Sequence, residues 1–205
     1  MTEAFPGMIK RVAITGGIAC GKSLFSRYLG RLGVDILDAD DVVHGLEGPG
    51  GRAVPSLVSL FGSRILGADG GVDRNVLGGL VFEDAAARAQ VNGVLHPLVR
   101  ETFRNWVAAC GQRPKAAIIP LLFEAGWAAE WEVIICLVSC EATQIERLMR
   151  VRGLSEEQAR RRIAAQMPVA EKAARSHLVV HNEADAEALA READKVYRFL
   201  MGRSE

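Results

Sequence analysis

Short apolar runs along the chain alternate with segments whose apolar residues recur every three or four positions. The runs that predict strands are 10–15, 34–37, 115–126, 132–140 and 177–182. The third and fourth runs are almost continuously apolar, as is typical of strands buried on both faces of a sheet. Because the strands alternate with helical segments, the pattern predicts an α/β fold with a five-stranded parallel sheet.

The helical segments carry start and stop signals. A helix is expected over 22–32 and another over 141–153, where Gly153 would end it. Ser155, with Gln158 three residues later, has the spacing of a capping box that begins a new helix. The closing helix over 183–202 is amphipathic, and its inner face would be formed by Leu189, Ala193, Val196 and Leu200.

The middle of the chain lacks this alternation of predicted strands and helices. Residues 45–72 are rich in glycine and proline around a short apolar helix at 54–62. Residues 72–110 then show a helical period, and Pro97 is expected to kink or start a helix there. We interpret 45–111 as a helical insertion in the α/β core.

Amino-acid composition limits the binding partners and the cellular compartment that are expected for this protein. The 205 residues are 49% apolar and have a formal net charge of zero, so no general attraction to nucleic acid or to a membrane surface is expected. No signal peptide or membrane span is predicted. The cysteines lack metal-binding spacing and indicate reduced thiols in a cytoplasmic protein, with Cys20 exposed to solvent; they are Cys20, Cys110, Cys136 and Cys140.

One segment carries a motif with a clear chemical purpose. Gly16 is followed by four residues and then by Gly21, Lys22 and Ser23, which is the spacing of a phosphate-binding loop. Such a loop brings backbone N–H groups to an anion at the start of a helix. The Lys22 ammonium would contact the β- and γ-phosphates of a nucleotide, and the Ser23 hydroxyl would bind Mg²⁺. The alternative is a chance match, but the motif lies between a predicted strand and a predicted helix, as it requires.

Acidic residues follow the second predicted strand. Asp38 and Asp40 lie at the edge of the sheet where the phosphate loop also lies, so they are expected near the transferable phosphate. No Asn-Lys-x-Asp segment for reading guanine is present, which argues against a GTPase. Strands three and four do not end in the acidic residues of motor ATPases. A small-molecule kinase is therefore favoured.

A second segment is rich in arginine. From 147 to 175 three acids stand against eight basic residues, which are Arg147, Arg150, Arg152, Arg160, Arg161, Arg162, Lys172 and Arg175. Some of these form i,i+4 pairs on a solvated helical face. The remaining charge is what a lid needs when it closes over a triphosphate, and Arg147 and Arg152 are the candidates for that role.

Several motifs together resemble those of the dephospho-coenzyme A kinases. These are "TGGIACGKS", "DADDVVH", "VFEDAAARAQVNGVLHP", "PLLFE" and "QIERLMRVRGLSEEQARRRIAAQMP", which occur in the family's order over nearly the whole chain. The family usually has Gly-Ser where this chain has Ala19 and Cys20. It also usually has an Asp where this chain has His177.

The resemblance implies a three-layer P-loop kinase core with a helical substrate-binding insertion and a lid. The core would comprise 8–44, 112–146 and 176–205, the CoA-binding insertion 45–111 and the lid 147–175. The implied reaction is transfer of phosphate from ATP, with Mg²⁺, to the ribose 3′-hydroxyl of dephospho-CoA. The partners would be ATP and dephospho-CoA, and the protein would be a monomer or a small homo-oligomer that binds neither nucleic acid nor membrane.

The resemblance also assigns residues. The expected ATP-binding residues are Gly17, Ile18, Ala19, Cys20, Gly21, Lys22, Ser23, Leu24 and Arg147. The expected catalytic residues are Asp40, as the acid that orients the acceptor hydroxyl, with Lys22 and Arg147. The expected residues on the dephospho-CoA side are Asp40, His44, Arg74, His96 and Glu124. Ser23 would hold the metal, and Asp38 would do so indirectly.

Each assignment has a plainer alternative. Asp40 could be a helix N-cap, His44 an exposed helix histidine and Arg74 a cap of the insertion. His96 and Glu124 could be polar residues at helix starts. For the whole protein, the alternatives are another P-loop small-molecule kinase of the nucleoside, nucleotide or shikimate type, or an ATP-binding regulatory module without catalysis.

Overall fold

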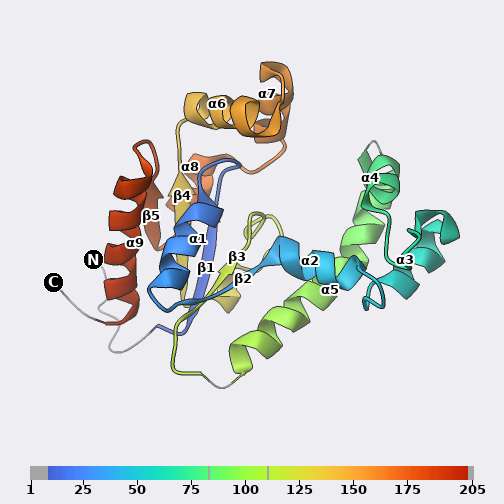
Figure 1. Ribbon diagram of the computed structural model, residues 1–205, viewed down its shortest axis with the longest axis horizontal. Helices are drawn as coiled ribbons and strands as arrows, with labels where there is room; N and C mark the ends of the chain where they lie inside the picture. Colours follow the sequence, from blue (N-terminus) through green and yellow to red (C-terminus); the bar gives the residue numbers. More distant parts are fainter. Residues whose placement is uncertain (1–8, 83, 110, 203–205) are drawn as a thin grey trace. The chain divides into compact units, whose positions relative to one another are not determined.

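The computed structural model describes residues 9–82, 84–109 and 111–202 (Figure 1). Cys110, one of the four cysteines, lies outside the described residues. Contacts within the chain define two compact units. Unit 1 comprises Met1–Leu37 and Cys110–Glu205, and unit 2 comprises Asp38–Ala109.

A five-stranded sheet forms the centre of the α/β core, in the order β2-β3-β1-β4-β5. The strands are β1 (Arg11–Gly16), β2 (Asp35–Asp38), β3 (Lys115–Ile118), β4 (Val133–Val138) and β5 (Leu178–His181). β1 pairs in parallel with β3 and β4, and β4 pairs in parallel with β5. The predicted α/β fold with five parallel strands is confirmed.

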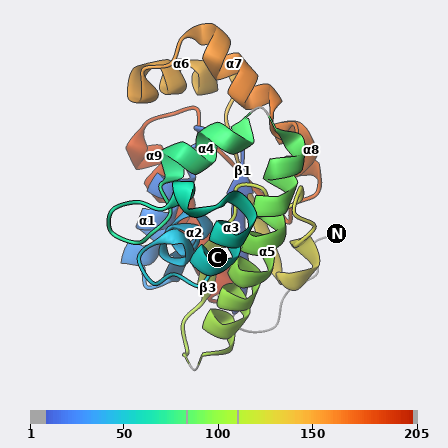
Figure 2. The ribbon, with the colours of Figure 1, turned by 90° about the vertical axis from the view of Figure 1, so that its right-hand side faces the viewer.

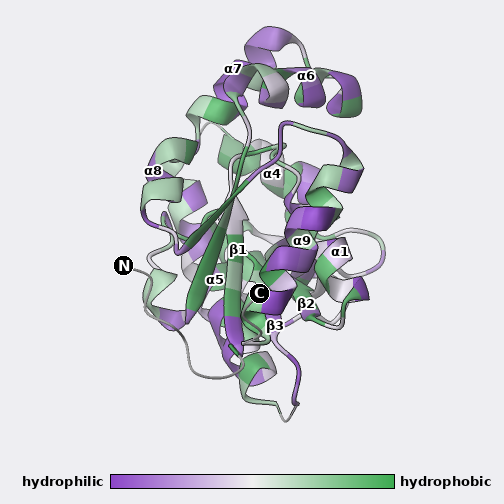
Figure 3. Ribbon diagram, turned by 90° about the vertical axis from the view of Figure 1, so that its left-hand side faces the viewer, coloured by the Kyte–Doolittle hydropathy of each residue, from purple (hydrophilic) through white to green (hydrophobic). Residues whose placement is uncertain are grey.

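Helices cover both faces of this sheet. α1 (Lys22–Arg31) and α9 (Ala186–Leu200) pack together on one face, and α8 (Val169–Ala174) packs on the other against β1 and β4 (Figure 3). A short 3₁₀ helix, η2 (Ala128–Glu130), precedes β4. The inner face predicted for the closing helix is confirmed, because Leu189, Ala193, Val196 and Leu200 are buried.

The third strand is shorter than its apolar run. The sequence predicts a strand over 115–126, but β3 ends at Ile118. Ile119 still donates its N–H to the Ile14 carbonyl at 2.9 Å, and Pro120, which follows it, has no N–H to continue the pairing. The chain turns there, and its apolar side chains, Leu122 and Phe123, are buried in the turn instead.

Before α8, the arginine-rich segment lies in two helices that extend beyond the sheet within unit 1 (Figure 1). α6 (Glu141–Arg152) ends at Gly153, which has a φ of 64°, and α7 (Glu156–Ala164) begins with the predicted Ser155–Gln158 capping box. A small apolar cluster holds the two helices together, and Ile18 and Ala19 of the phosphate loop pack against it.

Unit 2 consists of helices arranged along the longest one, α5 (Ala85–Ala108) (Figure 2). α2 (Ala39–Glu47), α3 (Val54–Phe61) and α4 (Arg74–Phe82) all pack against α5, and a 3₁₀ turn, η1 (Ser63–Ile65), follows α3. Pro97 lies inside α5, so the expectation that it starts a helix is wrong. Pro97 removes one backbone hydrogen bond from α5. The helix tolerates this loss because its buried apolar face continues on both sides of the proline.

The boundary between the units lies between residues 37 and 38, whereas the sequence analysis places the boundary between core and insertion after residue 44. The difference is α2, which packs on α5 in unit 2. Within the described residues, no helix combines the length and apolar character needed to cross a membrane.

Candidate active site

The phosphate loop connects β1 to α1 in unit 1. Gly16 has a φ of 135°, and a Cβ at this position would lie 2.1 Å from the Leu137 carbonyl oxygen, so only glycine fits. Gly21, with a φ of 90°, is the N-cap residue of α1, and no side chain caps this helix end. The first N–H groups of a helix can bind an anion, and at this helix end Gly21 brings no capping side chain to compete for them.

Ala19 is the one residue other than glycine with a positive φ, 59°, among the described residues. A left-handed alanine costs about 1–2 kcal/mol. Its carbonyl accepts a hydrogen bond, and its side chain packs on the α6–α7 cluster. These contacts offset the strain.

The Lys22 side chain folds back over the loop. Its Nζ donates to the carbonyl oxygens of Gly16, at 3.1 Å, and Gly17, at 2.8 Å. Ser23 is exposed beside it in the first turn of α1. A phosphate group bound at this helix end would meet a lysine ammonium, a serine hydroxyl and backbone N–H groups, which is the chemistry that the motif predicts.

Behind the loop, Arg147 and Asn182 hold its carbonyl groups. Arg147 Nη1 donates to the Ala19 oxygen at 3.2 Å, and its Nη2 donates to the Asn182 oxygen at 2.9 Å. The Asn182 side chain donates to the Cys20 oxygen at 3.0 Å. Ser139 accepts from Arg147 at 3.1 Å and donates to the Asn182 oxygen at 2.8 Å. The Arg147 guanidinium thus contacts the loop directly.

Cys20 is fully buried, so the expectation of an exposed thiol is wrong. Its sulfur lies close to Gly17 of the same loop, 2.9 Å from where a Cβ at that position would be. Burial raises the pKa of the Cys20 thiol, against the opposing effects of Lys22, Ser139 and Arg147. Burial likewise raises the pKa of Cys136, to about 11. Both thiols are therefore neutral at physiological pH, and Cys20, Cys136 and Cys140 form no disulfide.

At the end of β2, the two acids have separate roles. Asp38 is the N-cap of α2, and its Oδ1 accepts the Asp40 N–H at 2.9 Å. The capping function proposed as the alternative for Asp40 therefore belongs to Asp38. Asp40 is exposed in the first turn of α2, one turn before the exposed His44.

Arg74 belongs to a polar cluster within unit 2. Its Nε contacts Glu47 Oε2 at 2.8 Å, and its Nη1 lies 3.1 Å from His44 Nδ1. The Glu47 side chain is only 7% exposed, whereas that of Arg74 is 48% exposed. A buried carboxylate thus orients a guanidinium whose outer part stays accessible. From the sequence, His44 and Arg74 are both expected on the dephospho-CoA side, but Glu47, which lies 27 residues from Arg74, is not.

His96 and Glu124 lie in different units. His96 is partly buried on α5, and this burial lowers its pKa. Glu124 lies in the turn after β3, where its Oε1 contacts Lys172 Nζ at 2.8 Å and accepts the Met167 N–H at 3.1 Å. Burial alone would raise the pKa of Glu124, but the hydrogen bonds from Lys172 and from backbone N–H groups lower it.

The predicted residues therefore form two sets. Unit 1 brings together the phosphate loop, Lys22, Ser23 and Arg147, and it also contains Glu124. Unit 2 brings together His44 and Arg74 and also contains Asp40 and His96. Three further polar residues of unit 1 contact the predicted site residues, although the sequence predicts no site role for them. Asn182 contacts Cys20, Ser139 contacts Arg147, and Lys172 contacts Glu124.

A model of the dephospho-CoA kinase family matches residues 10–188. The chain belongs to this family. The curated dephospho-CoA kinase of Anaeromyxobacter dehalogenans (strain 2CP-C) is 40% identical and covers 93% of this chain and 92% of its own. That of Geobacter sulfurreducens (strain ATCC 51573 / DSM 12127 / PCA) is 37% identical, over 91% of this chain and 96% of its own.

Solved structures agree with the family fold. The crystal structure of TT1252 from Thermus thermophilus has a TM-score of 0.78 at 31% identity, with 92% of this chain and 96% of that chain covered. Dephospho-CoA kinase from Campylobacter jejuni has a TM-score of 0.66 at 22% identity, with 94% and 98% covered, and it supports the fold alone. Shikimate kinase from Acinetobacter baumannii, at 0.51 and 15%, shares the same general fold, with 98% and 97% covered.

Proposed function

We propose that this protein is an ATP-dependent dephospho-CoA kinase, which transfers the γ-phosphoryl group of ATP to the ribose 3′-hydroxyl of dephospho-CoA. The observation that carries the proposal is the family match over residues 10–188, which contain the phosphate loop as well as Asp40, Arg74 and Glu124. The products are coenzyme A and ADP. Other P-loop kinase activities are not favoured by these relatives.

In this reaction, unit 1 binds the phosphoryl donor. The first N–H groups of α1 and the Lys22 ammonium bind the β- and γ-phosphates, and they stabilise negative charge as the bond to the leaving ADP breaks. Lys22 then exchanges the Gly16 and Gly17 carbonyl oxygens for phosphate oxygens. The Arg147 guanidinium lies against the same loop and adds positive charge beside the nucleotide.

Unit 2 supplies the residues for the acceptor. Asp40 orients the 3′-hydroxyl and accepts its proton as the new oxygen–phosphorus bond forms. Asp38 occupies the helix-capping position, so the Asp40 carboxylate is available for this work. Arg74, held by Glu47, binds the diphosphate of dephospho-CoA, and His44 and His96 of the same unit contribute further contacts. Glu124, which belongs to unit 1, is proposed as a separate polar contact for dephospho-CoA.

An ATP-using kinase implies a divalent metal ion, and we propose that it is Mg²⁺. Among the described residues, no group of three His, Cys, Asp or Glu side chains is placed to hold a metal. The Ser23 hydroxyl and nucleotide phosphates form the oxygen donor set that Mg²⁺ prefers, with Asp38 acting indirectly. When bound, the ion neutralises phosphate charge. Location in the cytoplasm and a monomeric or small homo-oligomeric state stay predictions from the sequence.

A panel of acceptors tests the proposed function. ADP release is measured with ATP and dephospho-CoA, a nucleoside monophosphate, a nucleoside or shikimate, and the product is identified by mass. The proposal predicts turnover with dephospho-CoA that exceeds turnover with each other acceptor by orders of magnitude. Preferred phosphorylation of another acceptor would contradict it, and ATP binding without any acceptor-dependent ADP release would indicate a regulatory module.

A further inference from the structure

Lys172 is a buried lysine on α8 that the proposed reaction does not use. Its side chain is 0% exposed, whereas charged side chains of this kind are rarely buried unless they are paired. The ammonium donates to the Pro120 carbonyl oxygen at 2.7 Å and contacts Glu124 Oε1 at 2.8 Å. A lysine that is fully buried does not contribute to solubility, so its role must lie in the two groups that it contacts.

The first contact connects Lys172 to the strand that leads into the phosphate loop. The Pro120 carbonyl oxygen also lies 3.4 Å from the Thr15 hydroxyl, which donates to it. Thr15 is fully buried at the end of β1, directly before Gly16, whose carbonyl oxygen accepts from Lys22. Two hydrogen bonds to one carbonyl thus join α8 to the base of the loop.

The second contact fixes the orientation of Glu124. Both Lys172 and the Met167 N–H contact its Oε1, while the side chain keeps 26% of its surface exposed. Two donors thus hold the carboxylate through Oε1, and the Glu124 side chain as a whole stays partly exposed. Arg175 lies over the neighbouring Phe123 ring at 4.6 Å, so the turn 120–124 is held at several points by the end of the arginine-rich segment.

We propose that Lys172 is a positioning residue for phosphoryl transfer, which acts through Glu124 and the Pro120 carbonyl. By holding both groups, it fixes the turn 120–124 against the base of the phosphate loop and directs the Glu124 carboxylate toward the acceptor. The inference rests on the proposed function, because it gives Glu124 its substrate-side role.

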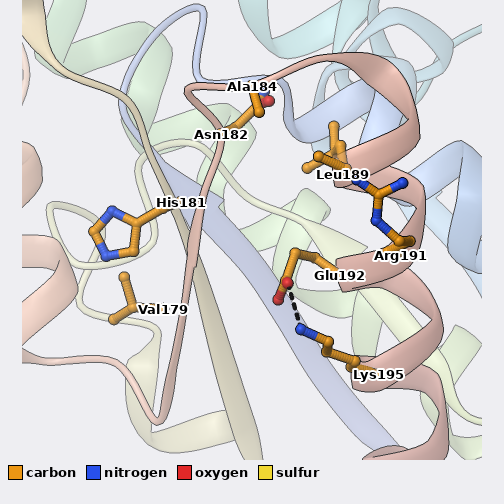
Figure 4. A pocket seen from close by; sticks show the side chains of 9 residues that line it. Val179, His181, Asn182, Ala184, Leu189, Arg191, Glu192 and Lys195 are labelled. Carbon is orange, nitrogen blue, oxygen red and sulfur yellow. Dashed lines mark hydrogen bonds and ion pairs between the residues drawn. The ribbon is translucent and has the colours of Figure 1, made fainter.

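The test compares Lys172→Met, Glu124→Gln and the double variant with Lys195→Met. Lys195 pairs with Glu192 at the same 2.8 Å but is 61% exposed on α9, so this pair is a matched surface control (Figure 4). For each variant, kcat and the KM values for ATP and dephospho-CoA are measured well below its unfolding temperature, and that temperature is recorded separately.

A positioning role predicts that Lys172→Met lowers kcat at least about tenfold while the KM for ATP changes less than about threefold. Glu124→Gln should lower kcat by a similar factor. The double variant should be no worse than the poorer single variant, because both residues act as one unit. Lys195→Met should match the wild type.

A lower unfolding temperature for Lys172→Met with unchanged kcat and KM values would overturn the inference and leave Lys172 a structural residue. So would losses that multiply in the double variant. If Lys172→Met does not fold, the double variant decides, because it leaves no unpaired buried charge; a kcat within about threefold of wild type would overturn the inference. Failure of the proposed function is seen separately, as wild-type protein without ADP release that depends on dephospho-CoA.

Discussion

The two units hold their candidate residues in different ways. In unit 1, Lys22 and Arg147 both donate to carbonyl groups of the phosphate loop, and Asn182 supports the same loop from behind. In unit 2, Asp40 is exposed, and the Arg74 guanidinium is held by buried Glu47 and lies beside His44, yet it stays about half exposed.

This difference supports separate proposed roles for the two units, with the phosphoryl donor bound by unit 1 and the acceptor by unit 2. A donor site whose cations are already in place stabilises transferring charge without reorganising during the reaction. An acceptor site with accessible side chains can take up a large molecule and select it by contacts. Substitutions of the phosphate-loop residues in unit 1 should therefore impair catalysis with any acceptor, whereas substitutions in unit 2 should act on the acceptor alone.

The largest effect is expected for Lys22→Met. It removes the ammonium proposed to bind the β- and γ-phosphates, and loss of one such preorganised donor costs about 10²–10³ in rate. Steady-state kinetics should show kcat/KM reduced by about a thousandfold. A reduction below about tenfold would contradict the difference drawn between the two units, because the donor site in unit 1 would then not depend on Lys22.

The next effect is expected for Asp40→Asn. It should lower kcat about a hundredfold or more, because the acceptor hydroxyl would lose the group proposed to orient it and to accept its proton. ATP affinity, measured by calorimetry, should change little.

The matched control is Asp41→Asn, which changes the neighbouring exposed acid in the same helical turn and should have little effect on rate. Loss of ATP binding in Asp40→Asn would instead place Asp40 with the nucleotide and its metal.

A smaller effect is expected for Arg74→Met. The KM for dephospho-CoA should rise about tenfold, which corresponds to about 1.4 kcal/mol of binding free energy, while the KM for ATP stays the same. Arg64→Met, which changes another exposed arginine of unit 2, is the control. Equal increases in both KM values would show that Arg74 does not act on the acceptor alone.

The smallest effect concerns the pH dependence of stability in unit 1. Burial would raise the pKa of Glu132, but hydrogen bonds from the Lys10 and Arg11 N–H groups and from the Arg11 side chain lower it below 4.5. A lowered folded-state pKa gives stability that is present above the unfolded pKa and lost as pH falls through the folded value.

Urea unfolding of wild type and Glu132→Gln should therefore show a more stable wild type at neutral pH. The difference should shrink below about pH 4. A difference that persists unchanged at lower pH would contradict the role of the ionised carboxylate.

The strands and the loop were predictable because their signals are local. Apolar runs located all five strands, and the glycine spacing located the phosphate loop. The end of β3 was missed because burial of Leu122 and Phe123 in a turn leaves the same apolar pattern as a strand. Pro120, which has no N–H, was the available signal.

The polar partners were not predictable because each depends on a residue far along the chain. Glu47 lies 27 residues from Arg74, Lys172 lies 52 from Pro120, and Asn182 lies 162 from Cys20. Sequence spacing gives the face of a helix but not the element packed against it. Only the fold brings such pairs into contact.

The acceptor atom tests the central claim most directly. ADP release by the wild-type protein is measured with dephospho-CoA and with its 3′-deoxy analogue at equal concentrations. The account predicts rapid turnover and a 3′-phosphorylated product with the first, and no turnover above the ATP background with the second. Equal turnover with both compounds would contradict transfer to the 3′-hydroxyl.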